Sequence, residues 1–501
     1  MSADTDEIAL DLLRTPEAGG RVVRGGLIRG VGFAISTGLG LATAILLLRH
    51  LGVVDFGRYA TVMAVLGIVG GITDAGLTAV GSREISVART AAERVHILNN
   101  LLLLRIVGAS LGVVAAVGFT VVAGYEGTVV AGTAVGGVGL VLISAQSMLT
   151  VPIWVALRIV SLTVLEVLRN LLTLIGVAGL VFAGAGLLAL FGVQIAVAAV
   201  LLPVTVLLAR VGVRFAGGVR RELIVRLLRE TLPLAVAFAM SVIYFRVLVV
   251  LVSLLSTEEQ TGLFGTSFRI FEMLLGLPAL ILSVALPLLS VAGAEDDSRL
   301  RSALQSMTEA SLLIAALLVV GIAILAEPGI RLIGGEEYAG AAPVLRIQAL
   351  ALIPLFLVQT WQLGLIAGRA QRALVVANGL ALAVVLVLGL ALVPSGGAEA
   401  AAWVAVAAET ALALFLWIAL GRMGPGGAPS LRVAWKVAGA AGLAAGAGYL
   451  LRDTAVVGAC VATVVFAAVA FATRAVPADL YYALGFRWGE DEEEDEPEEE
   501  P

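Results

Sequence analysis

Six arginines interrupt the long apolar stretches of this 501-residue sequence. A charged side chain inside a membrane-spanning helix is costly and usually faces a polar cavity or a partner, so these arginines are the first candidates for function. A guanidinium group stays charged and can donate two parallel hydrogen bonds, which suits an anion with several oxygen atoms, such as a diphosphate. The six residues are Arg29, Arg105, Arg169, Arg246, Arg269 and Arg346.

Arg246 is the strongest candidate among them, because it lies near the middle of its apolar stretch and has no acidic residue one helical turn away. Arg29 lies one turn into the first apolar stretch, where it either faces a cavity or extends to the membrane interface. Arg269 and Glu272 are three residues apart, so they either line a site together or neutralise each other.

The other three arginines have structural explanations. Arg105 and Arg346 lie near the ends of their apolar stretches, so we expect both side chains to extend to the interface. Arg169 follows Glu166 by three residues, and we expect these two to form a structural pair.

Acidic and polar aromatic residues are few within the apolar stretches. Glu409 is either a proton or sodium site or a structural acid facing a cavity, and a cation exporter would need such carboxylates unpaired. Gln359 and Trp361 either contact sugar rings or make ordinary helix contacts. The predicted substrate-binding residues are Arg246, Arg269, Arg29, Glu272, Asp74, Gln359 and Trp361, with Glu409 as the candidate for ion coupling.

Several classes of chemistry are excluded by rare residue types. Cys460 is the single cysteine, so an intramolecular disulfide or a paired-cysteine metal site is excluded, and only His50 and His96 could supply imidazole ligands. Lys436 is the only lysine and lies in no phosphate-binding motif. We therefore expect no metal, no cofactor, no catalytic residue and no ATP hydrolysis.

The elements that carry these residues are predicted to be transmembrane helices. The sequence is 60% hydrophobic and 14% charged, with a mean hydropathy of +1.04, whereas about a quarter of the residues in soluble proteins are charged. Apolar windows of about 20 residues can cross a bilayer core of about 30 Å, and they predict an all-α integral membrane protein with about fourteen spans. The windows are 27–48, 59–80, 101–123, 129–151, 163–183, 187–208, 232–255, 264–291, 310–326, 343–367, 373–393, 400–420, 434–450 and 454–473.

The distribution of positive charge predicts that both termini lie in the cytoplasm. With that orientation, 22 lysine and arginine residues fall on the cytoplasmic side and four on the other side. The segment 490–500 holds ten acidic residues, so we expect a disordered, solvated tail.

A long basic connection at 210–229 divides the spans into two blocks of six, with two further spans after them. FGRYA at 56–60 and TGLFG at 261–265 open the second span of each block, which is a weak indication of duplication. The predicted segments are 1–24 (cytoplasmic), 25–215 (helices 1–6), 216–425 (helices 7–12), 426–475 (helices 13 and 14) and 476–501 (the acidic tail).

Four stretches carry a resemblance to a known family. They are LLLRHLGVVDFGRYATVMAVLGIVGGITDAGLTAVGSREIS at 46–86, IYFRVLVVLVSLLSTEEQTGLFGTSFRIFEMLLGLPALILSVALPLLS at 243–290, EEYAGAAPVLRIQALALIPLFL at 336–357 and GRAQRALVVANGLALAVVLVLGLALVPSGGAEAAAWVAVAAE at 368–409. Together they resemble the polysaccharide (O-antigen type) flippases of the multidrug, oligosaccharidyl-lipid and polysaccharide exporter superfamily.

The resemblance implies two pseudo-symmetric lobes, helices 1–6 and 7–12, around a central cavity that opens alternately to each side of the membrane. Members of this family are thought to hold a lipid diphosphate with cavity arginines, which agrees with the choice of Arg29, Arg246 and Arg269. Relatives often have Arg-x-Asp in the seventh helix, whereas Leu248 stands at the aspartate position here. A role of that carboxylate in ion coupling is therefore not carried over.

The function expected from residues and resemblance together is that of a non-enzymatic flippase in the cytoplasmic membrane. Its expected partners are a polyprenyl-diphosphate-linked oligosaccharide or polysaccharide precursor, membrane lipids and glycan-assembly enzymes, with no nucleic acid. One alternative is a drug or cation exporter of the same superfamily, and another is a scaffold that recruits partners through the acidic tail. A membrane glycan polymerase is a weaker alternative, because the outer connections are short, 327–342 being among the longest.

Overall fold

The computed structural model describes residues 16–74, 76–209, 221–276, 297–367, 370–423, 427–451 and 454–476. Residues 477–501 of the predicted acidic tail lie outside the described residues, as do residues 1–15 of the predicted N-terminal segment.

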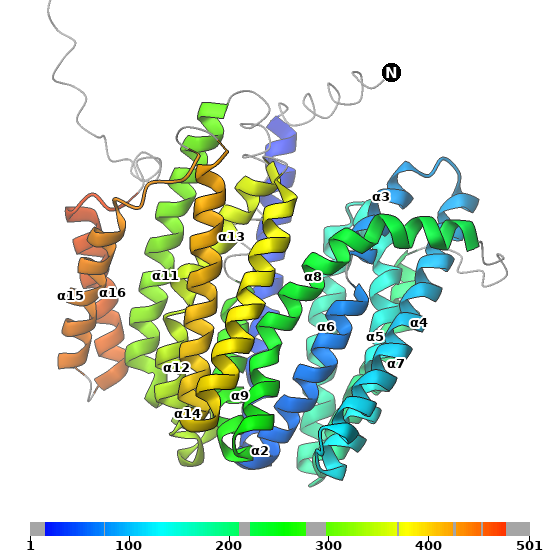
Figure 1. The fold of residues 1–501 in the computed structure, drawn as a ribbon, viewed down its shortest axis with the longest axis horizontal. Coiled ribbons are helices and arrows are strands. Elements are labelled where there is room, and N and C mark those ends of the chain that lie inside the picture. The colour runs from blue at the N-terminus through cyan, green and yellow to red at the C-terminus, as the bar shows by residue number, and fades with distance from the viewer. Residues whose placement is uncertain are drawn as a thin grey trace, which may run out of the picture. The chain divides into compact units, whose positions relative to one another are not determined.

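Every regular element in these ranges is helical, which confirms the predicted all-α fold (Figure 1). The helices are α2 (Pro16–Asp74), α3 (Leu77–Val87), α4 (Ala91–Val122), α5 (Gly127–Val155), α6 (Ile159–Phe182), α7 (Leu187–Ala209), α8 (Arg221–Leu255), α9 (Glu258–Leu274), α11 (Asp297–Gly334), η1 (Glu336–Tyr338), α12 (Ala341–Ala349), α13 (Leu352–Ala367), α14 (Gln371–Gly421), α15 (Ala434–Leu450) and α16 (Ala455–Ala472).

Ten helical segments of the described chain are long and apolar enough to cross a membrane, so this is a multi-pass membrane protein. The segments that contain α2 and α14 are each interrupted by a glycine with a left-handed backbone, Gly52 at φ 69° and Gly397 at φ 53°. Both breaks fall between spans that the sequence predicted as separate. Because α9 and α15 have 17 residues each, the count of fourteen spans stays a prediction.

The chain forms two compact units. The first unit comprises Met1–Leu274, Ile330–Val344 and Asn378–Ala405, and the second comprises Leu275–Gly329, Leu345–Ala377 and Val406–Pro501. The lobe boundaries 25–215 and 216–425 stay a prediction.

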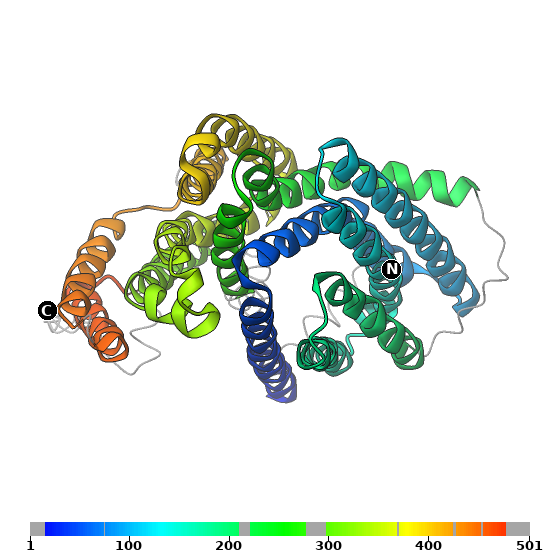
Figure 2. The same ribbon diagram turned by 90° about the horizontal axis from the view of Figure 1, so that it is seen from below.

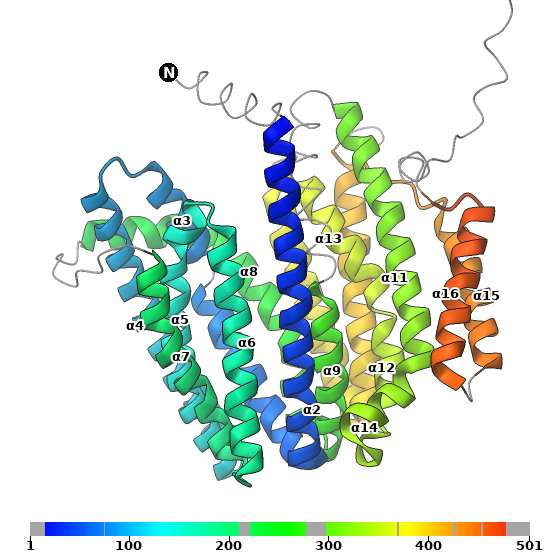
Figure 3. The ribbon, with the colours of Figure 1, turned by 180° about the vertical axis from the view of Figure 1, so that it is seen from behind.

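Within the first unit, α2 is the central helix. It contacts α5, α6, α8 and α9, and its first half runs beside α6 (Figure 3). α4, α6 and α7 all pack on α5, so these four helices form one group (Figure 2). Tyr59 of α2 stacks on Phe191 of α7 with ring centroids 5.4 Å apart, over a core that includes Val62 and Leu66. The second half of α2 therefore lies among helices from distant parts of the sequence.

The start of this second half also meets the start of α9 through two glycines. A Cβ atom at Gly57 would lie 2.6 Å from the backbone oxygen of Glu258, and one at Gly262 would overlap the backbone oxygen of Val53. Only glycine allows the two backbones to approach this closely.

Arg58 lies beside that contact and joins the starts of two other helices to the middle of α2. Its guanidinium group forms ion pairs with Asp55 (3.0 Å), Glu126 (2.8 Å) and Glu258 (2.9 Å). Glu126 precedes α5 and Glu258 begins α9, so one side chain connects the starts of α5 and α9 to α2.

Arg58→Gln is expected to lower the free energy of unfolding by about 1 kcal/mol, because the four side chains are partly exposed and solvent screens their attraction. The measurement is a double-mutant cycle with Glu258→Gln, read from thermal unfolding in detergent. The matched control is the exposed pair Arg331 and Glu336 (3.0 Å), where the coupling should be smaller. Equal coupling in the two cycles would show that the Arg58–Glu258 pair is no stronger than an isolated surface ion pair.

Candidate functional site

Arg246 comes from α8 and lies directly against the second half of α2. A Cβ atom at Gly67 would be 2.7 Å from Cδ and from Nε of Arg246, so the arginine side chain occupies the space that this glycine leaves. One turn further along α2, a Cβ atom at Gly71 would overlap the side chain of Val242. Two glycines four residues apart on one helix face thus bring α8 and its guanidinium group against α2.

Glu272 of α9 is shared by two arginines. One carboxylate oxygen accepts a hydrogen bond from Nη2 of Arg246, and the other accepts one from Nη1 of Arg269 at 3.0 Å. Because two guanidinium groups meet one carboxylate, this arginine cluster (Arg246, Arg269 and Glu272) keeps a net positive charge. Arg246 has no acidic partner within α8, as predicted, but it has one from the neighbouring helix.

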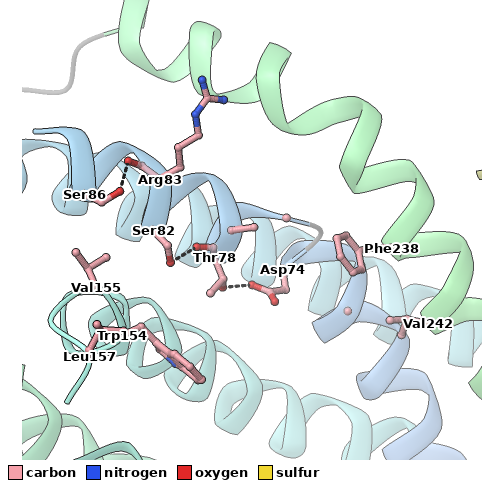
Figure 4. A pocket seen from close by; sticks show the side chains of 13 residues that line it. Asp74, Thr78, Ser82, Arg83, Ser86, Trp154, Val155, Leu157, Phe238 and Val242 are labelled. Atoms are coloured by element: carbon pink, nitrogen blue, oxygen red, sulfur yellow. Dashed lines mark hydrogen bonds between the residues drawn. The ribbon is translucent and has the colours of Figure 1, made fainter. Parts of the chain in front are cut away.

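Two cavities adjoin this region of α2. The inner cavity, of about 210 Å³, is lined by Arg246 together with Tyr59, Gly67 and Gln194. The larger cavity, of about 690 Å³, is named the outer cavity without reference to a side of the membrane. It is lined by Asp74, Thr78, Arg83, Trp154 and Phe238 among others (Figure 4). Gly71 lines both, so both cavities lie beside the glycine that lets α8 approach α2.

Asp74, in the wall of the outer cavity, is neutralised. Its Oδ1 accepts a hydrogen bond from Oγ1 of Thr78 at 2.7 Å and lies 3.1 Å from Nη1 of Arg105. The expectation that Arg105 extends to the interface is wrong, because its side chain is only 6% exposed and pairs with Asp74. α4 begins at Ala91, which places Arg105 about four turns inside the helix.

Two further arginines stand at the outer cavity. Arg29 is exposed and lies over the ring of Trp154, with Cζ 5.7 Å from the ring centroid. Arg83 extends toward α8, whereas Trp154 lies on the other side of α3 (Figure 4). Neither arginine forms an ion pair with a side chain in the part of the chain that the structure describes. The cavity therefore has positive charge near two of its edges.

The last two of the six arginines inside the apolar stretches are Arg169 and Arg346, and each has a polar partner from another part of the chain. Arg169 donates a hydrogen bond to Oε1 of Gln146 at 2.5 Å, so its close partner is this amide and not Glu166 as predicted. Arg346 lies 3.5 Å from Glu327 and has a partly exposed side chain, in keeping with its place near the end of a span.

Three predicted site residues belong to the second unit. Trp361 is 2% exposed, and its Nε1 donates a hydrogen bond to Oγ1 of Thr308 at 3.1 Å, which is an ordinary helix contact. Glu409 is buried, and Gln359 is partly exposed. Substrate contact by Gln359 and Trp361, and ion coupling by Glu409, stay predictions.

The structure thus joins Arg246, Arg269 and Glu272 in one cluster and places Asp74 and Arg29 at the outer cavity. Trp154, Arg83 and the two glycines Gly67 and Gly71 were not predicted as site residues from the sequence. The signal for the glycines was present, since small residues four apart on a membrane helix favour close helix packing. Among the described residues, no group of three histidine, cysteine or acidic side chains could hold a metal ion.

Comparison with known proteins agrees with this architecture. The sequence profile of a family described as polysaccharide biosynthesis protein matches residues 22–293. A search of curated proteins finds no match.

Solved structures share the fold at low sequence identity. The lipid II flippase MurJ, in an inward closed conformation, is 14% identical with a TM-score of 0.74, over 91% of this chain and 99% of that one. An inward-facing multidrug resistance transporter of the MATE family is 16% identical with a TM-score of 0.63, over 79% and 97% of the two chains. A MOP superfamily transporter from Pyrococcus furiosus, described as having a binding pocket of reverse polarity, is 15% identical with a TM-score of 0.58, over 82% and 96%. The fold is therefore that of transporters of the MurJ and MATE type.

Proposed function

This chain belongs to the polysaccharide biosynthesis protein family, and we propose that it is a flippase that moves a polyprenyl-diphosphate-linked glycan precursor across the cytoplasmic membrane. The proposal extends to alternating access as the transport mechanism and to a cytoplasmic location of both termini, which the charge distribution supports. Glycan-assembly enzymes remain the proposed protein partners.

The main support for the proposal is that arginines outnumber carboxylates beside the two cavities. Asp74 is paired with Arg105, and Glu272 is paired with both Arg246 and Arg269, so at least one guanidinium group balances the charge of each carboxylate. The arginine cluster is left with excess positive charge, and Arg29 and Arg83 add to it. An anionic substrate is therefore favoured over a cation.

A diphosphate suits this arrangement for a geometric reason. Arg246 and Arg269 already present donors to one small anionic group, the Glu272 carboxylate. A phosphate group presents comparable oxygen atoms with more negative charge, so it can compete for the same donors. The outer cavity of about 690 Å³ is within the usual size range of ligand sites, and we assign it to the sugars next to the diphosphate.

The site that binds a coupling ion is proposed to lie outside the arginine cluster, because Glu272 is already paired with two arginines. Glu409 remains the candidate for proton or sodium coupling, since it is a buried carboxylate inside a span of the second unit.

The test is reconstitution of the full chain into phosphatidylglycerol vesicles with undecaprenyl-diphosphate N-acetylglucosamine. Movement is followed by the access of an impermeant lectin to the sugar from outside. We expect protein-dependent movement of this lipid and no protein-dependent efflux of the cationic dye ethidium under a sodium or proton gradient. Dye efflux without lipid movement would instead support the cation exporter.

A further inference from the structure

An apolar groove runs between the first half of α2 and α6. Its volume is about 490 Å³, and its walls are almost entirely aliphatic, including Val31 and Ile35 on α2 and Val164 and Leu171 on α6. Both helices belong to segments that can span a membrane, so hydrocarbon is the natural content of this groove.

The two helices touch within the groove. A Cβ atom at Gly32 would overlap the side chain of Thr163, which shows that α2 and α6 are in direct contact there. Ile28 and Ile35 are seven residues apart on α2, so the groove follows the helix for about 10 Å. It is long enough for the first part of a lipid chain, while the rest of the chain would stay in the bilayer.

The polar end of the groove is defined by Arg29. Ile28 lines the groove, the next residue is Arg29, and the guanidinium group of Arg29 lies over Trp154 in the wall of the outer cavity. The order along the surface is therefore an aliphatic groove, a cation on an aromatic ring and then a large cavity with polar residues. A lipid-linked glycan has the same order of chain, diphosphate and sugars.

We propose that the groove between α2 and α6 binds the hydrocarbon chain of the lipid substrate next to its diphosphate as the headgroup enters, while Arg29 faces the diphosphate before it reaches the arginine cluster. This inference rests on the proposed flippase function. The substrate fits better than a bulk phospholipid, because the groove leads to a cavity of about 690 Å³. The sugars of a lipid-linked glycan can occupy this cavity, whereas a small phospholipid headgroup would leave most of it unfilled. The chain and the headgroup would thus be held by the same unit of the protein, which contains α2, α5 and α6.

The experiment uses undecaprenyl-diphosphate N-acetylglucosamine with a photoactivatable diazirine on the isoprene unit nearest the diphosphate. The full chain in phosphatidylglycerol vesicles is irradiated, and the labelled peptides are mapped. We expect labelling within residues 28–35 and 163–171 that a tenfold excess of unlabelled substrate removes and added phosphatidylglycerol does not.

Three tryptophan variants test the walls. Val31→Trp and Val164→Trp fill the groove from opposite sides and should lower this labelling about tenfold, the effect of losing contact with roughly two methylene groups. Val138→Trp on α5 is the matched control, because Val138 is 51% exposed against 53% for Val31 and 52% for Val164, and it lines neither the groove nor a cavity described above. The control should label like the wild type.

The outcomes separate this inference from the proposed function. Sugar movement without labelling of these two segments overturns the groove and leaves the flippase function standing. Labelling that phosphatidylglycerol displaces also overturns the inference, since the groove would then hold bulk lipid. Absence of both movement and labelling overturns the two proposals together.

Discussion

Arg246→Ala is expected to reduce movement of the lipid-linked sugar about a hundredfold. The substitution removes a charge-assisted donor from a site of low dielectric, at a cost of about 3 kcal/mol in substrate binding. It also leaves Glu272 paired with Arg269 alone, so the cluster loses its excess positive charge and the reason for preferring an anion. The measurement is the rate at which the sugar becomes accessible to an impermeant lectin in reconstituted vesicles.

Three further variants test whether the effect is specific to the guanidinium group of Arg246. Arg246→Lys keeps the charge but loses the planar pair of donors, so it should retain an intermediate rate. Glu272→Gln removes the competing carboxylate and should tighten substrate binding while slowing release. Arg346→Ala, in the second unit, removes a partly exposed arginine with a 3.5 Å ion pair and should leave the rate within about twofold. Equal losses for Arg246→Ala and Arg346→Ala would contradict a specific role of the arginine cluster.

The depth of Arg246 could be predicted from the sequence, but its partner could not. A long apolar run places residue 246 near the middle of a predicted span, and residue 246 also lies near the middle of Phe238–Leu255, the part of α8 that is apolar enough to cross a membrane. Helical periodicity, however, compares residues of the same helix, whereas Glu272 approaches from α9. The partner of an intramembrane charge depends on which helices are neighbours, and that information lies in the tertiary packing.

Arg105 and Trp361 show two further limits of sequence patterns. Arg105 stood near the start of a predicted span, but α4 begins ten residues before that predicted start and carries the side chain inward to Asp74. Trp361 has the amphipathic character of a sugar-binding residue, yet its indole N–H is satisfied by Thr308 of a neighbouring helix. The helix breaks near Gly52 and Gly397 could be predicted, because polar residues interrupt the apolar runs there.

Gly67→Val is expected to stop transport almost as completely as Arg246→Ala, although it changes no charge. The new Cβ atom would lie 2.7 Å from Cδ and Nε of Arg246, so the guanidinium group has to leave its place against α2. We expect a lower free energy of unfolding, by about 1 to 3 kcal/mol, together with a loss of transport of about a hundredfold. Gly38→Val is the matched control on the same helix, because a Cβ atom there has no neighbour within 4 Å.

The steric cause can be separated from a general effect of valine by combining both changes. In the Arg246→Ala background the side chain that valine would strike is gone, and the space can accept the larger residue. The double variant should therefore unfold at nearly the same temperature as Arg246→Ala alone, which makes the coupling between the two sites large and favourable. If Gly67→Val lowers the free energy of unfolding equally in both backgrounds, the loss of stability does not come from a clash with the Arg246 side chain. The glycine would then not be needed to make room for this arginine.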